Sequence, residues 1–327
     1  MSQVSSTAKP HSGLITGMGA ALVDLFAAVS EEELAALGSP KASMSLIDAA
    51  QSSALQENIN VDTRQPGGSI ANSIAGIAAL GMATGFIGKI GDDDLGRVFA
   101  DAFMKGHVRF PAMPMTTAPT GHCLVLITPD AERTMHTVLG ASVTTEAKDL
   151  DSALLADTGL LFGEGYLWDS PSARDAFLEA AARVRGQGGR LAFSLADGLC
   201  VARHHQAFMG LLDEIDILLA NEAEIEALLG TDVPDAIAEK LVAYDILAAV
   251  TFGADGAHLF NKTARAHVPA QHLTADDIVD LTGAGDQFAA GFLTGLHQGK
   301  AMEAAAQMGI DAASAVIRHI GPRPPLD

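Results

Sequence analysis

Short apolar runs alternate with helical patterns through the second half of the chain. The apolar runs have the length of buried strands and lie at residues 159–163, 190–195, 216–220 and 246–252. The segments between and after them repeat their apolar residues every three to four positions, which predicts helices at 171–185, 203–213, 286–298 and 301–319. Alternating strands and helices are typical of a parallel sheet covered by helices. The sequence therefore predicts a three-layer α/β/α fold with a mostly parallel central sheet.

The first half of the chain begins in the same way and then changes. A strand is predicted at 14–18, a helix at 69–80 and a strand at 83–88. Between residues 108 and 139 the pattern turns to β-type runs such as 122–128, bounded by prolines. We interpret these runs as a small β lid that projects from the main sheet.

The predicted organisation is one domain with two excursions. Residues 13–327 are expected to form a single α/β domain, with lid segments at approximately 24–66 and 107–140. The first residues are polar and lack an apolar core, so 1–12 is expected to be a flexible tail.

Charge and composition narrow the range of partners. The chain has 40 acidic and 20 basic residues, a formal net charge of −20, which disfavours nucleic acid and anionic membranes as partners. Any nucleotide site must therefore draw its positive potential from backbone amides and bound cations. No stretch reaches the roughly 18 apolar residues of a membrane span. The two cysteines are far apart, which argues against disulfides and fits a cytoplasmic location.

The strongest candidate site is the segment Asp280-Leu-Thr-Gly-Ala-Gly-Asp286, which leads directly into a predicted helix. Small residues before a helix start leave backbone N–H groups open at the positive end of the helix dipole. We expect Gly283, Ala284 and Gly285 to form a cradle for a transferring phosphate. Asp286 at its mouth is placed to accept the proton of an attacking hydroxyl. The alternative is structural: Asp286 caps the helix and the glycines only turn the chain.

A second glycine pair, Gly67-Gly68, precedes another predicted helix that carries Asn72. Paired glycines let the backbone approach a ligand closely, and the Asn72 amide can both donate to and accept from sugar hydroxyls. The structural alternative is a plain turn with Ser69 as the N-cap.

Gly17-Met18-Gly19 after the first strand is an incomplete dinucleotide fingerprint, because Leu22 stands at the third glycine position. A nicotinamide-dependent oxidoreductase is thus disfavoured but kept as a distant alternative. Asp24, which we expect just past the strand end, can chelate a vicinal diol; otherwise it is a solvated loop residue.

Two further turns follow predicted strands. Asn221 and Glu224 begin a helix at a strand's carboxyl end, where they can hold waters around a magnesium–phosphate complex, although a capping box explains them equally well. The turn from Thr251 through Gly253 to Gly256 is an ordinary hairpin signal that can also line an ATP site. A P-loop, protein-kinase signatures and H-E-x-x-H are absent from the sequence, and we predict no structural metal.

Taken together, these segments resemble the ribokinase-like (PfkB-type) carbohydrate and nucleoside kinase family. The resemblance runs in order from about residue 14 to 321 and is most specific at Pro66–Asn72 and at Asp280–Asp286 with Ala289-Ala290-Gly291. It implies an ATP-dependent kinase with a lid that closes to exclude water. It implies roles for the residues above: a catalytic base at Asp286, an anion hole at Gly283, Ala284 and Gly285, sugar contacts at Asp24, Gly67, Gly68 and Asn72, magnesium support at Asn221 and Glu224, and ATP contacts at Thr251, Gly253 and Gly256. It also implies a monovalent cation such as K⁺ near Asp280 and Thr282.

The acceptor is predicted from details of the same resemblance. Ser69 stands where ribokinases have Lys, so the first signature is similar to the Gly-Gly-Ser form of adenosine kinases. The runs Glu132–Met135 and Ala312–Arg318 are also similar to bacterial adenosine-kinase-like members. Glu164 points the other way, because it stands where some sugar kinases place an acid near the sugar. We predict adenosine, with ribose, fructose or a related sugar as the alternative, in a monomer or homodimer; the intact Asp286 disfavours a catalytically silent nucleoside sensor.

Overall fold

The computed structural model describes residues 12–111, 117–130 and 132–324, so the predicted tail lies outside the described residues except for Ser12. Its main body is built on an eight-stranded sheet with the order β13-β12-β11-β10-β9-β8-β1-β5. All neighbouring strands are parallel except where β12 pairs with β11 and β13. These strands are β1 Leu14–Met18, β5 Thr84–Ile87, β8 Thr158–Glu164, β9 Arg190–Ser194, β10 Ile217–Asn221, β11 Leu247–Thr251, β12 Ala257–Phe260 and β13 Arg265–Val268.

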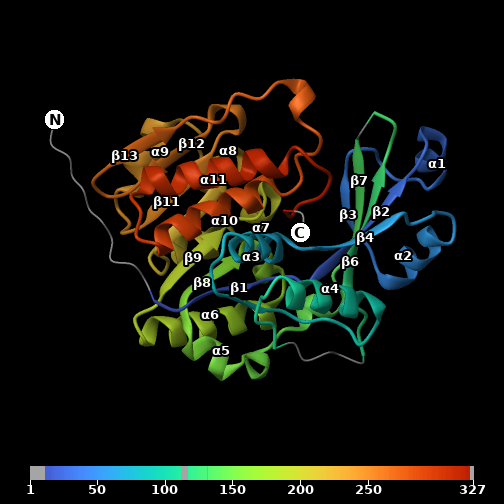
Figure 1. The fold of residues 1–327 in the computed structure, drawn as a ribbon, viewed down its shortest axis with the longest axis horizontal. Helices are drawn as coiled ribbons and strands as arrows, with labels where there is room; N and C mark the ends of the chain where they lie inside the picture. Colours follow the sequence, from blue (N-terminus) through green and yellow to red (C-terminus); the bar gives the residue numbers. More distant parts are fainter. Residues whose placement is uncertain (1–11, 112–116, 131, 325–327) are drawn as a thin grey trace.

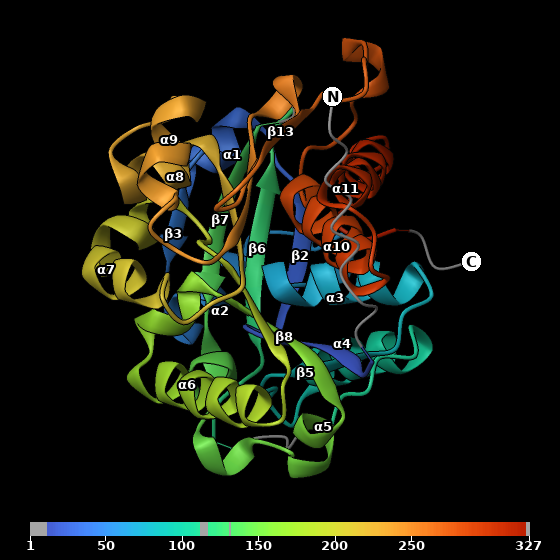
Figure 2. The same ribbon diagram turned by 90° about the vertical axis from the view of Figure 1, so that its left-hand side faces the viewer.

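Helices cover both faces of this sheet (Figures 1 and 2). One face packs against α3 Ser69–Ala79, α10 Ala284–His297 and α11 Met302–Val316. The other face packs against α5 Ser152–Ala156, α6 Pro171–Gly186, α7 Gly198–Leu211, α8 Glu222–Leu229 and α9 Pro234–Leu241. Residues alternate between the two cores along a strand: Leu160 and Phe162 of β8 belong to the first core, and Leu161 belongs to the second.

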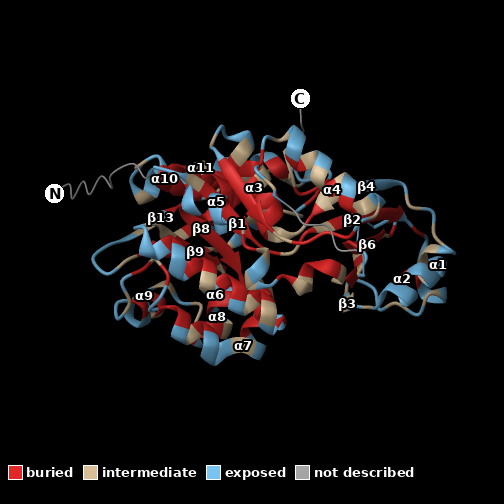
Figure 3. Cartoon of the chain, turned by 90° about the horizontal axis from the view of Figure 1, so that it is seen from below, coloured by how far each residue is buried: buried red, intermediate tan, exposed pale blue. Residues whose placement is uncertain are grey.

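A second, five-stranded sheet stands beside the main body, with the order β3-β7-β6-β2-β4 (Figure 1). We call it the small sheet. Helices α1 and α2 belong to this part and are largely exposed (Figure 3), while α4 contacts both β2 and β4. The elements are β2 Leu22–Ala28, α1 Glu31–Ala36, β3 Met44–Leu46, α2 Ala49–Gln56, β4 Thr63–Gly67, α4 Asp94–Lys105, β6 Gly121–Ile127 and β7 Arg133–Val138.

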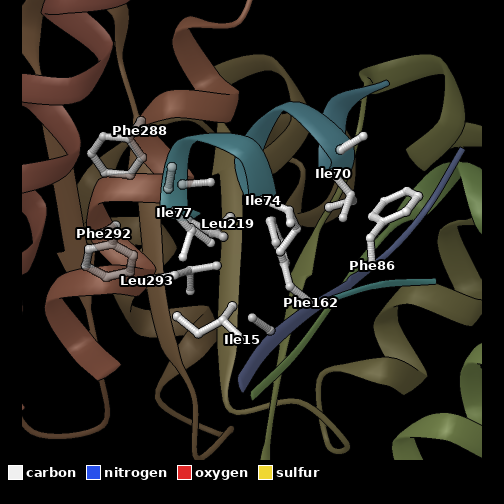
Figure 4. Packing of buried hydrophobic residues seen from close by; sticks show 14 of the residues in the cluster. Ile15, Ile70, Ile74, Ile77, Phe86, Phe162, Leu219, Phe288, Phe292 and Leu293 are labelled. Atoms are coloured by element: carbon white, nitrogen blue, oxygen red, sulfur yellow. The ribbon is translucent and has the colours of Figure 1, made fainter. Parts of the chain in front are cut away.

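Helix α3 ties the two signature segments together. Its buried face presents Ile70, Ile74 and Ile77 to the sheet, where they meet Ile15 and Phe162 (Figure 4). The same helix packs against α10, whose Phe288, Phe292 and Leu293 lie in the same core. This packing sets the first turns of α3 and α10 side by side, and both turns begin with glycine-containing segments.

The predicted α/β fold with a mostly parallel sheet is confirmed, and β1 has its predicted bounds. Two expectations were wrong. Asp24 does not follow a strand end: it lies inside β2, where it pairs with Gln65 of β4 and Cys123 of β6. Helices α1 and α2 were not expected, because their short segments carry few apolar residues in a helical repeat; capping boxes at Ser30 and Asp48 begin them instead.

Short 3-10 turns connect several of these elements. They lie at Gly140–Thr144, Ala147–Asp149, Gly165–Asp169, Gly253–Asp255 and Ala275–Asp277. Within the described residues, no helix is long and apolar enough to cross a bilayer.

The close packing of α10 on α11 depends on Gly291. A Cβ placed there would lie 2.2 Å from the Met308 carbonyl oxygen, so Gly291→Ala must push the helices apart. We expect a loss of about 1–3 kcal/mol, the usual cost of overpacking, in urea unfolding. Gly210→Ala, at an exposed position of α7 with open space around it, is the matched control and should gain up to about 1 kcal/mol. Equal effects of the two substitutions would contradict this account.

Candidate active site

The segment 280–286 forms a turn that enters α10. Gly283 is the N-cap and has a left-handed backbone with φ 80°, which favours glycine. Its Cα approaches Pro322 so closely that a Cβ would lie 2.6 Å from the Pro322 backbone. A Cβ on Gly285 would meet open space instead. The first N–H groups of α10 have no acceptor within the helix, and they lie at the positive end of its dipole.

Asp286 stands in the first turn of α10 and receives two hydrogen bonds from α3. The Ser69 hydroxyl donates to one carboxylate oxygen at 2.7 Å, and the Asn72 amide donates to the other at 2.9 Å. The structural alternatives predicted Asp286 and Ser69 as helix N-caps, and this was wrong. The N-cap of α10 is Gly283, and the N-cap of α3 is Gly68. The two signature segments meet through one carboxylate.

Burial raises the pKa of Asp286, even though Ser69 and Asn72 donate to it and Arg323 lies nearby. A carboxylate with a raised pKa is a stronger proton acceptor. The arrangement is thus suited to remove a proton from an alcohol.

Asp24 and the glycine pair lie next to this carboxylate. A Cβ on Gly67 would lie 2.5 Å from the Asp24 carboxylate. Gly68 has φ 90°, and a Cβ on it would clash with the Ala20 carbonyl oxygen. Burial raises the pKa of Asp24 to about 7; Arg323 opposes this rise, and Asp286 adds to it. The structure thus brings together Asp24, Gly67, Gly68, Asn72 and Asp286.

A cavity of about 200 Å³ opens in front of Asp286 at the carboxyl ends of the central strands. This is the edge where ligands bind in open α/β sheets. Five of the residues singled out from the sequence line it: Ser69, Asn221, Glu224, Thr251 and Gly285, together with Asp286 itself.

Asn221 and Glu224 form a capping box at the start of α8 and also face this cavity. The Asn221 amide donates to Glu224 at 2.6 Å, and the Glu224 N–H donates back to Asn221 at 2.9 Å. Burial raises the pKa of Glu224 to about 7. The capping box is therefore confirmed, and it fixes two side chains that line the cavity; their predicted role at magnesium stays a prediction.

The other predicted ATP contacts are divided. Thr251 pairs with Asn221 across β11 and β10 and lines the cavity. Gly253 and Gly256 lie in the turn between β11 and β12, with φ of 52° and 108°, and neither is among the residues that line the cavity.

Glu164 is placed differently from a sugar contact. It is 1% exposed, and its two carboxylate oxygens accept the N–H groups of Ala20 and Ile70. Burial raises its pKa to about 7. Glu164 therefore holds the turn after β1 against the start of α3, and it is not among the residues that line the cavity.

Gly17 and Gly19 serve the same packing. A Cβ on Gly17 would lie 2.5 Å from Ile70 and Ile74, and one on Gly19 would lie 2.7 Å from Glu164. The incomplete dinucleotide fingerprint is thus explained by the close approach of α3.

Asp280 and Thr282 are engaged by the small sheet. Arg133 of β7 forms a salt bridge with Asp280 at 2.6 Å, and it also donates to the Thr282 hydroxyl. The Gly321 N–H donates to the same Asp280 carboxylate at 2.9 Å. Although burial raises the pKa of Asp280, the hydrogen bonds from Arg133, Gly321 and Thr282 lower it overall.

Three residues of the site were given no catalytic or binding role from the sequence. Arg133 and Ser69 lay within motifs that carry the family resemblance, but no local pattern indicated which residues they contact. Arg323 had no signal at all: it is a basic residue between two prolines near the C-terminus, and its contact with Asn72 depends on the path of the chain after α11.

Comparison with known proteins agrees with this geometry. A family model described as pfkB family carbohydrate kinase matches residues 31–327. The chain therefore belongs to the PfkB family of carbohydrate kinases. It is an ATP-dependent phosphotransferase that acts on a hydroxyl group of a nucleoside or sugar.

Individual relatives fall on both sides of that choice. The crystal structure of adenosine kinase from Sinorhizobium meliloti is 36% identical, with a TM-score of 0.88 and 96% of each chain covered. A probable sugar kinase from Rhizobium etli is 34% identical, with the same TM-score and coverage. Aminoimidazole riboside kinase from Salmonella typhimurium is 30% identical over 252 residues, which is 72% of this chain and 75% of that protein.

The raised pKa of Asp24 predicts a pH-dependent stability. A carboxyl group with a higher pKa in the folded state contributes stability below its unfolded pKa, and this contribution is lost as the pH rises from the unfolded value through the folded one. Asp24→Asn should therefore raise the melting temperature of the free protein near pH 8, by on the order of 2 °C, the shift that about 1 kcal/mol produces. The gain should shrink toward pH 5. Asp101→Asn, at an exposed position of α4, is the control, and a gain independent of pH would contradict the assignment.

Proposed function

We propose that the protein transfers the γ-phosphoryl group of ATP to the 5′-hydroxyl of adenosine. The observation that carries the proposal is the composition of the small-sheet face that is turned toward Asp286. One end of this face offers a carboxylate for sugar hydroxyls, and its middle is apolar, as a nucleobase requires.

The face is defined by strand register. Asp24 and Phe26 of β2 lie opposite Cys123 and Val125 of β6, and Val125 lies opposite Met135 of β7. Paired residues point to the same side of a sheet, so these side chains share one face.

Both ends of this face lie near the main body. At one end the Asp24 carboxylate is close enough to Asp286 for their charges to interact, and at the other Arg133, opposite Ile127, forms a salt bridge with Asp280. Between them lies an apolar cluster of Phe26, Cys123 and Val125, with Ile127 and Met135 packed against it. A purine can bury its rings on such a surface, whereas a free sugar would set its hydroxyls against apolar side chains. The names of two relatives, an adenosine kinase and an aminoimidazole riboside kinase, support the same choice.

In the proposed reaction, the acceptor hydroxyl gives its proton to Asp286 as its oxygen forms a bond to the γ-phosphorus. The bond between that phosphorus and the bridging oxygen breaks, and ADP leaves. The first N–H groups of α10 around Gly283, Ala284 and Gly285 face the charge that develops on the transferred group. Thr251, Gly253 and Gly256 are proposed to lie along the bound ATP.

A magnesium ion suits the oxygen donors beside the cavity. Asn221 and Glu224 would hold it through water, and it would neutralise phosphate charge when bound. A monovalent cation near Asp280 and Thr282 is supported less well, because Arg133 already engages both side chains. K⁺ would need Arg133 to leave these atoms.

A substrate panel tests the proposal. With ATP and each acceptor in turn, kcat/KM from ADP release should be at least ~10-fold higher for adenosine than for ribose or fructose, a difference of about 1.4 kcal/mol. Phe26→Ala should lower kcat/KM for adenosine by roughly 2- to 10-fold, because it removes an aromatic partner of the base, and should leave the weak activity on ribose unchanged. Preference for ribose or a hexose, or equal losses on both substrates in the variant, would overturn the choice of adenosine.

A further inference from the structure

The chain that follows α11 runs through the candidate active site. Figure 1 draws the segment after α11 in dark red, on the side of the main body that faces the small sheet. The Gly321 N–H donates to Asp280, and the Pro322 carbonyl oxygen accepts from Gln287 at 3.0 Å. Arg323 then reaches Asn72. We call residues 321–323 the C-terminal strap. Its consecutive residues contact Asp280 at the start of the 280–286 turn, helix α10 and helix α3.

Arg323 is the half-buried end of this strap. Its Nε donates to the Asn72 side-chain oxygen at 2.8 Å, and a terminal nitrogen donates to the Gly67 carbonyl oxygen at 3.3 Å. Its guanidinium lies over the rings of Phe99 and Phe103, 5.8 and 5.3 Å from their centroids. A planar guanidinium held on aromatic faces keeps one orientation, which an ammonium group would not do.

Asn72 connects this guanidinium to the base. Its oxygen accepts from Arg323, so its NH₂ group must face the other way, and that group donates to Asp286 at 2.9 Å. The backbone oxygen of Asn72 accepts from Gln287 of α10, which also binds the strap at Pro322. Two linked routes thus run from the strap to the first turn of α3.

The charges around Asp286 explain why a cation is needed there. Carboxyl groups face it from three elements: Asp24 of β2, Glu164 of β8 and Glu224 of α8, each with its pKa raised to about 7 by burial. Asp286 adds to the rise at all three. Arg323 lowers the pKa values of both Asp24 and Asp286, and Arg133 also lowers the pKa of Asp24. The neutral donors to Asp286 are Ser69 and Asn72.

We propose that Arg323 is a positioning residue for phosphoryl transfer: held by the C-terminal strap, it orients the Asn72 amide and places a positive charge near the Asp286 carboxylate. This inference rests on the proposed role of Asp286 as the base. Arg323 acts through Asn72 and through its charge, so its loss should change the pH dependence of turnover as well as its rate.

The experiment is the pH profile of kcat for three variants of the full chain. Arg323→Met and Arg323→Gln remove the charge, and Arg323→Lys keeps it without the planar donors. In both neutral variants the acid limb of kcat should move up by about one pH unit, the effect of losing a nearby opposite charge on a carboxyl group. At a fixed pH on the acid limb, below both the wild-type and the shifted pKa, turnover should fall roughly 10-fold, the rate equivalent of that one-unit shift. Arg323→Lys should lower kcat but leave the acid limb near its wild-type position.

Arg318→Met, an exposed arginine on the same terminal segment, is the matched control and should leave rate and profile unchanged. If both neutral variants lose rate with an unmoved acid limb, or if Lys moves the limb as far as Met does, the proposal is overturned. Two neutral variants are used so that the test stands if one of them fails to fold.

The wild-type profile separates this proposal from the one on which it rests. If wild-type turnover shows no acid limb, Asp286 is not acting as a titrating base and the proposed mechanism fails first. If the wild type shows the limb and the neutral variants do not move it, only the role of Arg323 fails.

Discussion

The site depends on one half-buried carboxylate shared between two helix starts. Asp286 belongs to α10, but both of its hydrogen-bond donors, Ser69 and Asn72, belong to α3, 217 and 214 residues away in sequence. A buried charge is costly unless hydrogen bonds and opposite charge offset the lost hydration. The packing of α3 on α10 supplies these partners, so the geometry of the candidate active site depends on the packing of the main core.

The same constraint explains how charge is arranged around the site. Asp24, Glu164 and Glu224 approach the carboxylate from different elements, and burial raises the pKa of each. In the proposed reaction, a magnesium ion would offset phosphate charge in this acidic cavity, and the helix dipole of α10 would meet the phosphates. The small sheet brings Arg133 to Asp280, at the edge of the same loop. The positive charges of Arg133 and Arg323 thus lie beside particular carboxylates, and the site does not depend on a broad basic surface.

Much of this arrangement was readable from the sequence, for identifiable reasons. The strands of the parallel sheet and the helices α3, α10 and α11 carry strong apolar periodicity, and glycines before a helix mark the 280–286 turn. The small sheet was less readable: β2 was missed because Asp24 interrupts its apolar run, and α1 and α2 depend on capping more than on periodicity. Contacts between distant segments left no local pattern. Neither the bond from Ser69 to Asp286 nor the path of Arg323 to Asn72 follows from spacing, and Glu164 was taken for a ligand contact although its oxygens bind backbone N–H groups.

The central claim is that Asp286, held by Ser69, takes the proton of the acceptor. A double-mutant cycle of Ser69→Ala and Asp286→Asn, read as kcat for the best acceptor, tests it most directly. Asp286→Asn alone should lower turnover by at least roughly 10²-fold while ATP binding persists. Ser69→Ala should lower turnover in the wild type but cause no further loss in the Asp286→Asn background, since its effect passes through the carboxylate. Near-normal turnover of Asp286→Asn, or fully additive losses, would contradict the account.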